Sequence, residues 1–510
     1  MPATKGLVVL YVPHYVDPRR FALSADYMAT PPLPYLALGT PLRAAGYDVR
    51  IIDAKWEKDP LGLVAEAARD AVCLGVTGLT GYAVRDGLLA SGAAKAANPC
   101  LPVVWGGWHS SWAARQAVED ARIDVVVKGQ GERSFPEVLD ALREKRALDG
   151  IAGIVFRGGD GAPRENMDRP PEDMNRLPPP AYDLVDVQRY IRVGPGPLRH
   201  ANLICSRGCP FQCDFCLDSR SKWFGLSLAR MEEELKFWVL GHGVNSVRFY
   251  DGNFFMGRDR LVDIARMING GEMAGRFAWT ATGVAKRLLH LDAEALGELR
   301  ASGCHQVAIG AESGSDDLLA QITNKTTVAE TTDAVRLLTR HGINQYLFFM
   351  VGYPDEPEDT LAKTLALITR LKAINPWLEL QLNFCVPLPG SIMFRKAVEK
   401  GLFTEPLRFE EWAEQDVSRP NLPHITPEYV EKVRRFMRYL LLAYPQRHRR
   451  NSLVSRVLDH PLARAAYEPV RRAARWRIER QAFALPVEAL LYDGLRSLRA
   501  RRMAPRAAAS

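Results

Sequence analysis

Three cysteines in one short stretch carry the clearest chemical signal in this sequence of 510 residues. Cys209, Cys213 and Cys216 have the spacing Cys-x3-Cys-x2-Cys, and Gly208 and Pro210 mark the stretch as a loop. Three thiolates held on one short loop can ligate three irons of a 4Fe–4S cluster, which leaves the fourth iron open to another ligand. Zinc is the main alternative, although zinc sites usually offer two Cys-x2-Cys pairs or histidines.

Of the five other cysteines, Cys205 lies close to the triplet and the rest are scattered along the chain. The eight cysteines lie at positions 73, 100, 205, 209, 213, 216, 304 and 385. A disulfide framework spreads cysteines through a short secreted chain, whereas four of eight within twelve residues of a long chain indicate a metal or cluster site. We expect Cys205 to end a strand, and a role near the cluster is the lesser alternative.

Two series of alternating predicted strands and helices make up most of the chain around this loop. In residues 6–150, short apolar stretches alternate with helical ones. Strands are predicted at 7–12, 49–53, 72–77, 101–105 and 125–127, and helices at 33–45, 61–71, 82–97 and 134–144. Nearly continuous apolar strands between helices predict a doubly wound α/β domain with a parallel sheet covered on both faces. Ligands of such sheets bind in the loops beyond the carboxyl ends of the strands.

A second alternation begins at residue 201. Strands are predicted at 202–205, 246–250, 277–282, 305–310, 345–351 and 379–386, and helices at about 227–241, 258–269, 291–302, 328–341, 357–374 and 391–401. Six βα units are too few for a closed eight-unit barrel, so we expect a partial (βα)6 barrel that stays open. The cysteine triplet directly follows its first strand.

Composition and charge set the domain boundaries. We expect the doubly wound domain at 1–150, a Pro-rich linker at 151–200, the partial barrel at 201–425 and a helical, Arg-rich extension at 426–510. The last 80 residues hold 19 Lys and Arg against 6 Asp and Glu, whereas the rest of the chain is net −5. A mildly acidic body is unsuited to nucleic acid, so no nucleic-acid partner is expected.

The chain contains no run of 18 apolar residues, so no membrane-spanning helix is predicted. Residues 7–12 read as a core strand and not as a signal peptide, because no cleavage pattern follows them. We therefore expect a cytoplasmic protein. For the basic tail three alternatives stay open: a solvated extension, peripheral contact with an anionic membrane at its inner face, and docking on a partner or on the body itself.

The stretch from Cys205 to Cys216 resembles the signature loop of radical S-adenosylmethionine (SAM) enzymes, including the aromatic Phe215 before the last cysteine. The resemblance implies a 4Fe–4S cluster on the triplet, with the amino and carboxylate groups of SAM on the open iron. Reductive cleavage of SAM then yields a 5′-deoxyadenosyl radical that abstracts a hydrogen atom from the substrate. A reductant such as flavodoxin or ferredoxin is the implied electron donor.

Further stretches in the barrel half resemble the same family, each at a predicted strand end. Residues 251–253 follow the second strand, and residues 310–314 resemble the Gly-x-Glu-Ser-Gly stretch of the family. They place four residues in the implied SAM site: Asp251, Gly310, Glu312 and Ser313. Lys325 also matches the family, but on its own it reads as a solvated surface charge.

The N-terminal half resembles the cobalamin (B12)-binding domain that precedes the radical SAM barrel in one large subfamily. Glycines at strand ends leave room for a large planar ligand and offer backbone N–H donors. The candidate corrinoid contacts are Thr77, Gly106, Gly107, His109, Gly129, Gly131 and Glu132. The motif Asp-x-His-x-x-Gly, which puts a histidine on cobalt, is absent, so the lower cobalt ligand stays open. For His109 the alternatives are a place near the corrinoid and local hydrogen bonding.

Together the resemblances cover about residues 1–400 and imply a cobalamin-dependent radical SAM methyltransferase. Such an enzyme moves a methyl group from SAM through methylcobalamin to an unactivated carbon of a small-molecule substrate, which would be lipophilic if the tail docks on a membrane. An oxidative cyclase without methyl transfer is the alternative, since the anaerobic magnesium-protoporphyrin monomethyl ester cyclase shares the domain order. A non-catalytic redox sensor that binds a cluster and a corrinoid, or a nucleic-acid-binding protein, is the alternative from another class. No catalytic acid or base is identified.

Overall fold

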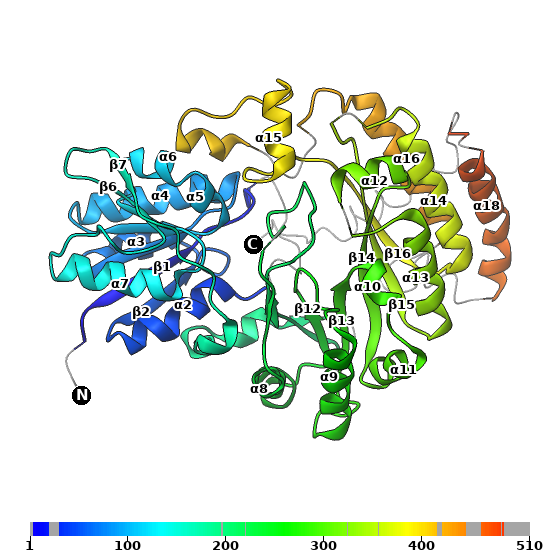
Figure 1. The fold of residues 1–510 in the computed structure, drawn as a ribbon, viewed down its shortest axis with the longest axis horizontal. Coiled ribbons are helices and arrows are strands. Elements are labelled where there is room, and N and C mark those ends of the chain that lie inside the picture. The colour runs from blue at the N-terminus through cyan, green and yellow to red at the C-terminus, as the bar shows by residue number, and fades with distance from the viewer. Residues whose placement is uncertain are drawn as a thin grey trace, which may run out of the picture.

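The computed structural model describes residues 4–19, 30–194, 197–219, 221–323, 325–354, 356–415, 421–444, 461–480 and 482–483. Two sheets of seven strands stand side by side, each covered by helices (Figure 1). The first is built from the N-terminal part of the chain and the second from the part after residue 190. This arrangement confirms the predicted fold class, a doubly wound α/β domain followed by a partial barrel.

The N-terminal sheet has the strand order β2-β1-β3-β4-β5-β6-β7. Its strands are β1 (Leu7–Val12), β2 (Asp48–Asp53), β3 (Ala71–Thr77), β4 (Val103–Gly106), β5 (Val125–Val127), β6 (Ile154–Arg157) and β7 (Pro163–Glu165). Its helices are α2 (Leu33–Ala44), α3 (Pro60–Ala68), α4 (Tyr82–Ala97), α5 (Trp108–Trp112), α6 (Ala114–Glu119) and α7 (Gly131–Arg143). Strands β1 to β5 are parallel in the order 2-1-3-4-5, so their carboxyl ends share one edge.

Both faces of this sheet are buried, which explains its nearly continuous apolar strands. Side chains alternate between the faces along a strand. In β1, Val9 and Tyr11 pack in one core, whereas Val8 and Leu10 pack in the core on the opposite face. A strand that is buried on both faces has no side exposed to solvent, so its sequence is a continuous run of apolar residues and not an alternation of apolar and polar ones.

The segment expected to be a linker begins as part of this sheet. Strands β6 and β7 add to its edge in antiparallel fashion, because Ile154, Val155 and Phe156 form an apolar run that is buried against the domain. Three short 3-10 helices follow, η1 (Met174–Arg176), η2 (Tyr182–Leu184) and η3 (Val187–Tyr190). Tyr190 donates a hydrogen bond to Asp53 of the N-terminal domain, 2.9 Å away. The Pro-rich stretch is therefore packed against the domains that it connects.

The second sheet has the order β16-β15-β14-β13-β12-β9-β8 and does not close. Its strands are β8 (Arg192–Val193), β9 (Arg199–Leu203), β12 (Ser246–Phe249), β13 (Ala278–Gly283), β14 (Cys304–Glu312), β15 (Asn344–Val351) and β16 (Glu379–Phe384). Strands β9 and β12 to β16 are parallel and correspond to the six predicted strands, and β8 adds one antiparallel strand at the edge. Their carboxyl ends again share one edge.

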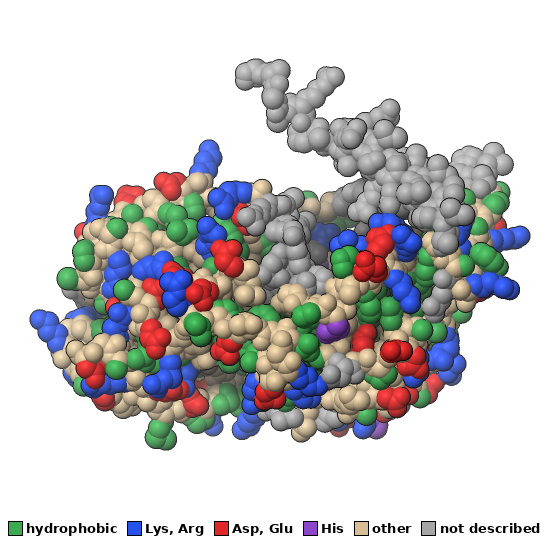
Figure 2. All heavy atoms as spheres, turned by 90° about the horizontal axis from the view of Figure 1, so that it is seen from above, with side chains coloured by type: hydrophobic (Ala, Val, Ile, Leu, Met, Phe, Trp, Pro, Cys, Tyr) green, Lys and Arg blue, Asp and Glu red, His purple; other side chains and the backbone are tan. Residues whose placement is uncertain are grey.

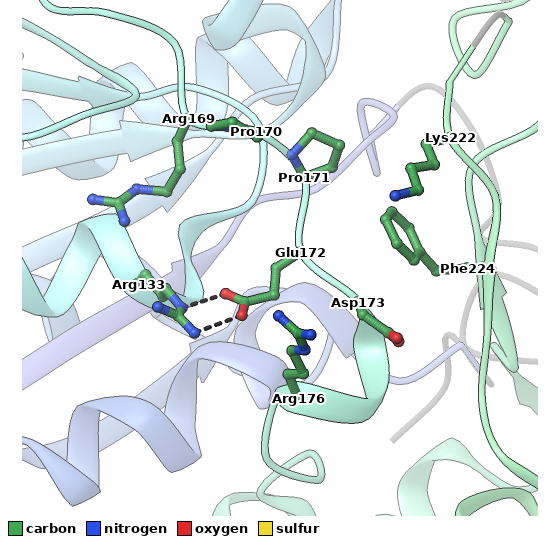
Figure 3. A pocket seen from close by; sticks show the side chains of 9 residues that line it. All are labelled: Arg133, Arg169, Pro170, Pro171, Glu172, Asp173, Arg176, Lys222 and Phe224. Carbon is green, nitrogen blue, oxygen red and sulfur yellow. Dashed lines mark hydrogen bonds and ion pairs between the residues drawn. The ribbon is translucent and has the colours of Figure 1, made fainter.

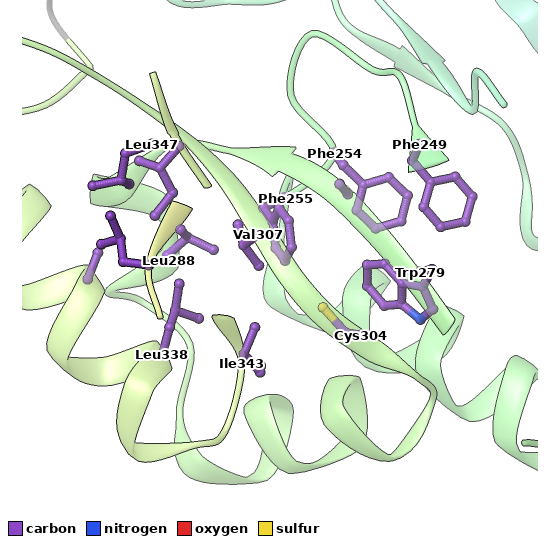
Figure 4. Packing of buried hydrophobic residues seen from close by; sticks show 14 of the residues in the cluster. Phe249, Phe254, Phe255, Trp279, Leu288, Cys304, Val307, Leu338, Ile343 and Leu347 are labelled. Atoms are coloured by element: carbon purple, nitrogen blue, oxygen red, sulfur yellow. The ribbon is translucent and has the colours of Figure 1, made fainter. Parts of the chain in front are cut away.

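Helices cover the outer face of this sheet. Helix α15 (Ile392–Glu399) and the 3-10 helix η5 (Phe409–Glu414) are exceptions and pack against the N-terminal domain. The helices over the barrel sheet are α8 (Leu228–Lys236), the short π-helix η4 (Phe237–Gly241), α9 (Arg258–Gly270), α10 (Ala285–Leu288), α11 (Ala293–Ala301), α12 (Asp316–Ile322), α13 (Val328–Arg340) and α14 (Thr360–Ile374). Under them, Phe249 stacks on Phe254 at 4.6 Å and meets Trp279 edge-on at 5.6 Å (Figure 4). Cys304 is buried in this packing layer, far along β14 from the strand's carboxyl end.

The tail packs on the body as far as it is described. Helix α16 (Pro427–Ala443) and the Arg-rich helix α18 (Pro461–Glu479) lie together on the outer side of the barrel (Figure 1). Phe436, Ala474 and Ile478 belong to the barrel core, and Tyr467 donates a hydrogen bond to the Leu442 carbonyl at 2.8 Å. Of the expected Arg-rich extension at 426–510, residues 445–460, 481 and 484–510 lie outside the described residues.

On the face shown in Figure 2, Lys and Arg side chains are interspersed with Asp and Glu. Among the described helices, none combines the length and the apolar character needed to cross a bilayer.

Candidate functional site

The cysteine triplet lies on a loop that hangs from a two-stranded ribbon. Strands β10 (Ser206–Arg207) and β11 (Phe224–Gly225) pair just beyond the carboxyl end of β9 and close the base of the loop. Gly208 turns the chain with φ of 81°, and a Cβ there would lie 2.1 Å from the Lys222 carbonyl oxygen. Only glycine fits such a position, so Gly208 sets the start of the loop.

The three thiols lie in one sheltered group. Cys213 is buried with Phe211 and Val284, and Cys209 and Cys216 pack against them. The Cys213 Sγ lies 3.1 Å from the Thr323 Oγ1. Burial raises the pKa of all three thiols, that of Cys216 to about 11, so metal binding would have to release their protons.

This donor set fits a 4Fe–4S cluster. Within the described ranges, no three His, Cys, Asp or Glu side chains converge closely enough to hold a single metal ion. In a 4Fe–4S cluster each thiolate binds a different iron, so the sulfurs need not meet at one point. Cys205 packs in the barrel core, separate from the group formed by the triplet.

A buried carboxylate ties the loop to the next strand. Asp251, directly beyond β12, accepts hydrogen bonds on Oδ1 from the Cys205 N–H at 2.9 Å, from the Ser206 hydroxyl at 2.7 Å and from the Ser206 N–H. Burial raises its pKa to about 6, although these donors oppose the rise. Asp251 thus anchors the base of the cysteine loop, and only its Oδ2 lacks a described partner.

Lys325 is not the surface charge that the sequence suggested. Its side chain is 13% exposed, and its Nζ lies 2.6 Å from Glu312 Oε1. Burial alone would lower the pKa of Lys325, but the Glu312 carboxylate and the Cys213 thiol hold it above its usual value. A Cβ at Gly310 would lie 2.5 Å from the lysine Nζ, so the glycine leaves room for this ion pair. The sequence motifs did not reveal this burial, because it depends on contacts with Glu312 and with Phe215 of the cysteine loop.

Buried polar atoms without described partners gather at the carboxyl edge of this sheet. They are Asp251 Oδ2, Asn253 Oδ1, Ser315 Oγ and Tyr353 Oη, which follow β12, β14 and β15. Ser313 is also fully buried there, with its Oγ 3.4 Å from the Thr364 Oγ1. Unpartnered buried polar groups are costly, so this edge is suited to a polar ligand such as SAM. Of these four residues only Asp251 was predicted from the sequence as a SAM-site residue; Asn253, Ser315 and Tyr353 were not.

The candidate corrinoid residues all lie at the carboxyl edge of the N-terminal sheet. Thr77 Oγ1 donates a hydrogen bond to the Gly106 carbonyl at 3.1 Å, and Gly107 leads into α5. The Gly129 N–H donates to Ser111 Oγ at 3.1 Å, and Gly131 starts α7. His14 Nδ1, Trp56 Nε1 and Ser110 Oγ, at the same edge, are buried without a partner among the described residues. This edge therefore also suits a large ligand with polar groups.

His109 is enclosed by aromatic rings of η5, a segment that follows the last barrel strand in the chain. Its Nδ1 lies 3.0 Å from Thr80 Oγ1, and its ring centroid is 5.0 Å from Trp412 and 5.6 Å from Phe409. Burial lowers its pKa to about 3, so the imidazole is neutral. Local hydrogen bonding, one of the two alternatives for His109, is thus present. The Nε2 atom of His109 is buried and has no partner among the described residues. The aromatic partners lie about 300 residues away in sequence, which hides the cage from motif analysis.

The two carboxyl edges meet. Arg207, in the ribbon of the cysteine loop, donates to Glu132 Oε1 at 2.6 Å, so this candidate corrinoid residue is engaged in a bridge between the domains. Helix α15 forms a second bridge (Figure 1). Its Met393 N–H donates to the Asp214 carbonyl at 2.9 Å, and its Phe394 meets Trp112 of the N-terminal domain at 5.4 Å. The cysteine loop therefore lies between the edges of both sheets.

Comparisons with known proteins agree with this geometry. Residues 203–368 match the radical SAM superfamily, and residues 21–139 match the B12-binding domain. The chain is 30% identical over 414 residues to an uncharacterized methyltransferase of Pyrococcus horikoshii, covering 79% of this chain and 86% of that one. It is 26% identical over 319 residues to the anaerobic magnesium-protoporphyrin IX monomethyl ester cyclase of Rubrivivax gelatinosus, covering 60% of this chain and 55% of the cyclase.

Among solved structures, the radical S-adenosylmethionine methyltransferase TsrM from Kitasatospora setae, with cobalamin and a 4Fe–4S cluster bound, superposes with a TM-score of 0.62. The match covers 78% of this chain and 76% of TsrM at 21% identity, so it establishes a shared fold.

Acid should destabilise the protein through His109. Burial lowers the pKa of His109 from 6.5 to about 3, so the unfolded chain takes up a proton at a higher pH than the folded protein does. The contribution of the buried neutral ring to folding is therefore fully present above pH 6.5 and is lost as the pH falls toward 3. We expect the unfolding free energy of the wild type to fall by about 1.4 kcal/mol per pH unit more steeply than that of His109→Gln over this range. Denaturant unfolding at a series of pH values measures the slopes. His290→Gln, at an exposed site, should follow the wild type; equal slopes for wild type and His109→Gln would contradict the buried ring.

Removing the anchor of the cysteine loop should impair cluster loading. In Asp251→Ala the N–H groups of Cys205 and Ser206 lose their acceptor, and we expect the iron and sulfide content after anaerobic reconstitution to fall by roughly half or more. Asp259→Ala, whose side chain is 91% exposed on α9, is the matched control and should load normally. Full loading of Asp251→Ala would show that the loop forms without this anchor.

Proposed function

This chain belongs to the radical SAM enzymes that carry a B12-binding domain, and we propose that it is a cobalamin-dependent methyltransferase acting on a carbon atom of a small molecule. The observation that carries the proposal is the position of the cysteine loop between the carboxyl edges of the two sheets. Radical methylation needs SAM with its cluster and the cobalamin next to the same substrate. Binding sites on two edges that face each other meet this requirement.

When bound, the cluster with SAM supplies a hydrogen-abstracting radical, and cobalamin supplies the methyl group. In this proposal Cys209, Cys213 and Cys216 ligate three irons. Phe211 and Val284 bury Cys213 and shelter part of the triplet from water, which favours radical chemistry. Lys325 places a positive charge beside the thiolates and so offsets part of their negative charge.

We assign SAM to the carboxyl edge of β12, β14 and β15. Gly310 and the Glu312–Lys325 pair offer an acceptor and a donor there, and Ser313 and Gly314 bring the chain close to α14. The unpartnered Asn253 Oδ1 and the remaining Asp251 oxygen are acceptors suited to an ammonium group.

We assign the corrinoid to the edge formed by Thr77, Gly106, Gly107, Gly129 and Gly131. His109 and Glu132 act there as positioning residues, since the first is enclosed by aromatic rings and the second holds Arg207. Because its imidazole is enclosed, His109 is not the lower ligand of cobalt in this proposal.

Cyclisation or oxidation without methyl transfer is the second candidate, because magnesium-protoporphyrin cyclases are among the relatives of this chain. The non-catalytic sensor and the nucleic-acid-binding protein are set aside, since the family to which the chain belongs consists of enzymes.

The products of SAM separate methyl transfer from cyclisation. After anaerobic reconstitution with iron, sulfide and cobalamin, and with a strong reductant, we expect both S-adenosylhomocysteine and 5′-deoxyadenosine. A cyclase would give 5′-deoxyadenosine alone. The Cys209→Ala/Cys213→Ala/Cys216→Ala variant should show neither cluster absorbance nor 5′-deoxyadenosine, whereas Cys100→Ala, at an exposed site, should behave as the wild type. SAM cleavage by the triple variant would refute the cluster assignment.

We further propose that the outer face of α18 makes peripheral contact with an anionic membrane. Arg472 and Trp476 are exposed on this face, a pairing of charge and interfacial aromatic that suits a bilayer surface. Such contact would bring a lipophilic substrate within reach of the enzyme.

Substitutions on α18 test the membrane contact better than truncation, because Ala474 and Ile478 are part of the core. R472E/W476A should sediment with phosphatidylserine-containing vesicles roughly tenfold less well than the wild type, since each basic residue contributes about 1 kcal/mol near such a surface. R336E/W377A, which changes an exposed pair elsewhere on the barrel, is the control. Equal sedimentation of wild type and R472E/W476A would exclude this surface.

A further inference from the structure

A basic pocket lies between the N-terminal domain and the ribbon of the cysteine loop (Figure 3). Its volume is about 390 Å³. Four cationic side chains line it: Arg133, Arg169, Arg176 and Lys222. Phe224 and two prolines add apolar walls. None of these residues has a role in the proposed binding of the cluster, SAM or cobalamin.

The pocket opens close to the proposed reaction site. Arg133 lies in the first turn of α7, directly after the carboxyl edge of the N-terminal sheet, and it follows Glu132, which binds Arg207. Lys222 and Phe224 lie on the returning arm of the cysteine loop, where the Lys222 carbonyl packs against Gly208. One molecule could therefore reach both the pocket and the space between the two sheets.

Both domains hold the wall of the pocket in place. Gln130 exchanges two hydrogen bonds with the backbone of Glu172, accepting from its N–H at 2.6 Å and donating to its carbonyl at 3.3 Å. On the other side, Asn175 donates to the Gly225 carbonyl at 3.0 Å and accepts from the Ser227 N–H at 2.7 Å. The segment 170–176 is thus fixed before any ligand arrives, which lowers the entropy cost of binding.

The cations in the pocket are unequally engaged. Arg133 forks onto Glu172, as Figure 3 shows, and Arg169 pairs with Glu137 outside the pocket. Among the described residues, Arg176 and Lys222 form no ion pair. Two carboxylates, Glu172 and Asp173, also line the pocket. The Asn175 N–H holds the pKa of Asp173 below its usual value, and the charges of Arg176 and Lys222 add to this.

Lys222 is also 4.9 Å from the centre of the Phe224 ring. A guanidinium and an ammonium that form no ion pair with a described residue, beside an aromatic wall, are groups that bind phosphate or carboxylate oxygens.

We propose that the basic pocket binds a phosphate or carboxylate group of a small molecule. Two sources of this group follow from the proposed function, on which the inference rests: an acidic group on the substrate, or the phosphodiester in the nucleotide loop of cobalamin. In either case Arg176 and Lys222 hold the anion, and the uncharged part of the molecule extends toward the junction of the two sheets.

Inorganic phosphate is the probe for the pocket. Calorimetric titration of the full-length protein with its reconstituted cluster, at low ionic strength, should detect phosphate binding that weakens at least about tenfold in R176Q/K222Q. R189Q/K236Q changes one exposed arginine of the same connecting segment and one exposed lysine of α8, and it should bind as the wild type does. Absence of phosphate binding by the wild type, or equal affinity in R176Q/K222Q, would overturn the proposal.

Because Lys222 lies near the cysteine loop, the iron content of each variant is measured alongside. R176Q alone lies outside that loop and tests the pocket even if K222Q lowers cluster loading. Phosphate binding does not require turnover, so the outcome is independent of whether the enzyme transfers a methyl group.

Two corrinoids distinguish the sources of the anion. Cobinamide lacks the nucleotide loop and its phosphodiester, whereas cobalamin carries both. If cobalamin abolishes phosphate binding and cobinamide does not, the pocket holds the cobalamin phosphodiester. If phosphate binds in the presence of either corrinoid, the pocket serves the acidic group of the substrate. Loss of phosphate binding with both corrinoids would place the corrin ring itself in the pocket and would overturn the assignment.

Discussion

The hydrogen bonds between Asp251 and the base of the cysteine loop hold the rest of the site together. A loop that presents three thiols cannot rely on its own short sequence for shape, because it has few internal backbone hydrogen bonds. The carboxylate at the end of β12 satisfies the N–H groups of Cys205 and Ser206 and so fixes where the loop leaves the sheet. Because Asp251 is buried, ionising it costs free energy, and the donors that it gathers offset this cost.

From that anchor the contacts extend into the other domain. The ribbon that starts at Ser206 carries Arg207 to Glu132, and the far side of the loop contacts α15 through Asp214. Helix α15 then packs Phe394 against Trp112, and the segment after it brings Phe409 and Trp412 into the core of the N-terminal domain. The segment after the last barrel strand thus packs on the first domain. The relative placement of the two sheets therefore depends on contacts between residues from both halves of the chain.

Much of the architecture was readable from local pattern. The strand Leu7–Val12 and the helix Tyr82–Ala97 lie where the sequence placed them, and the six barrel strands were all anticipated, because buried parallel strands are short apolar runs between helices. Strands β6 and β7 were missed, since a Pro- and Gly-rich context hides an apolar run of three residues. The reading of Lys325 as a surface charge was wrong, because its burial depends on contacts with Glu312 and the cysteine loop that no local pattern encodes.

The sequence by itself determined the chemistry. The spacing of Cys209, Cys213 and Cys216 is a local property, since residues a few positions apart on one loop must be neighbours in space. The tertiary structure alone decided which groups surround that chemistry. The Glu132–Arg207 bridge, the aromatic cage of His109 and the basic pocket between Arg133 and Lys222 join residues that are 75 to about 300 positions apart. Such contacts depend on how two separately formed sheets pack, and that packing is set by the sum of many weak apolar contacts.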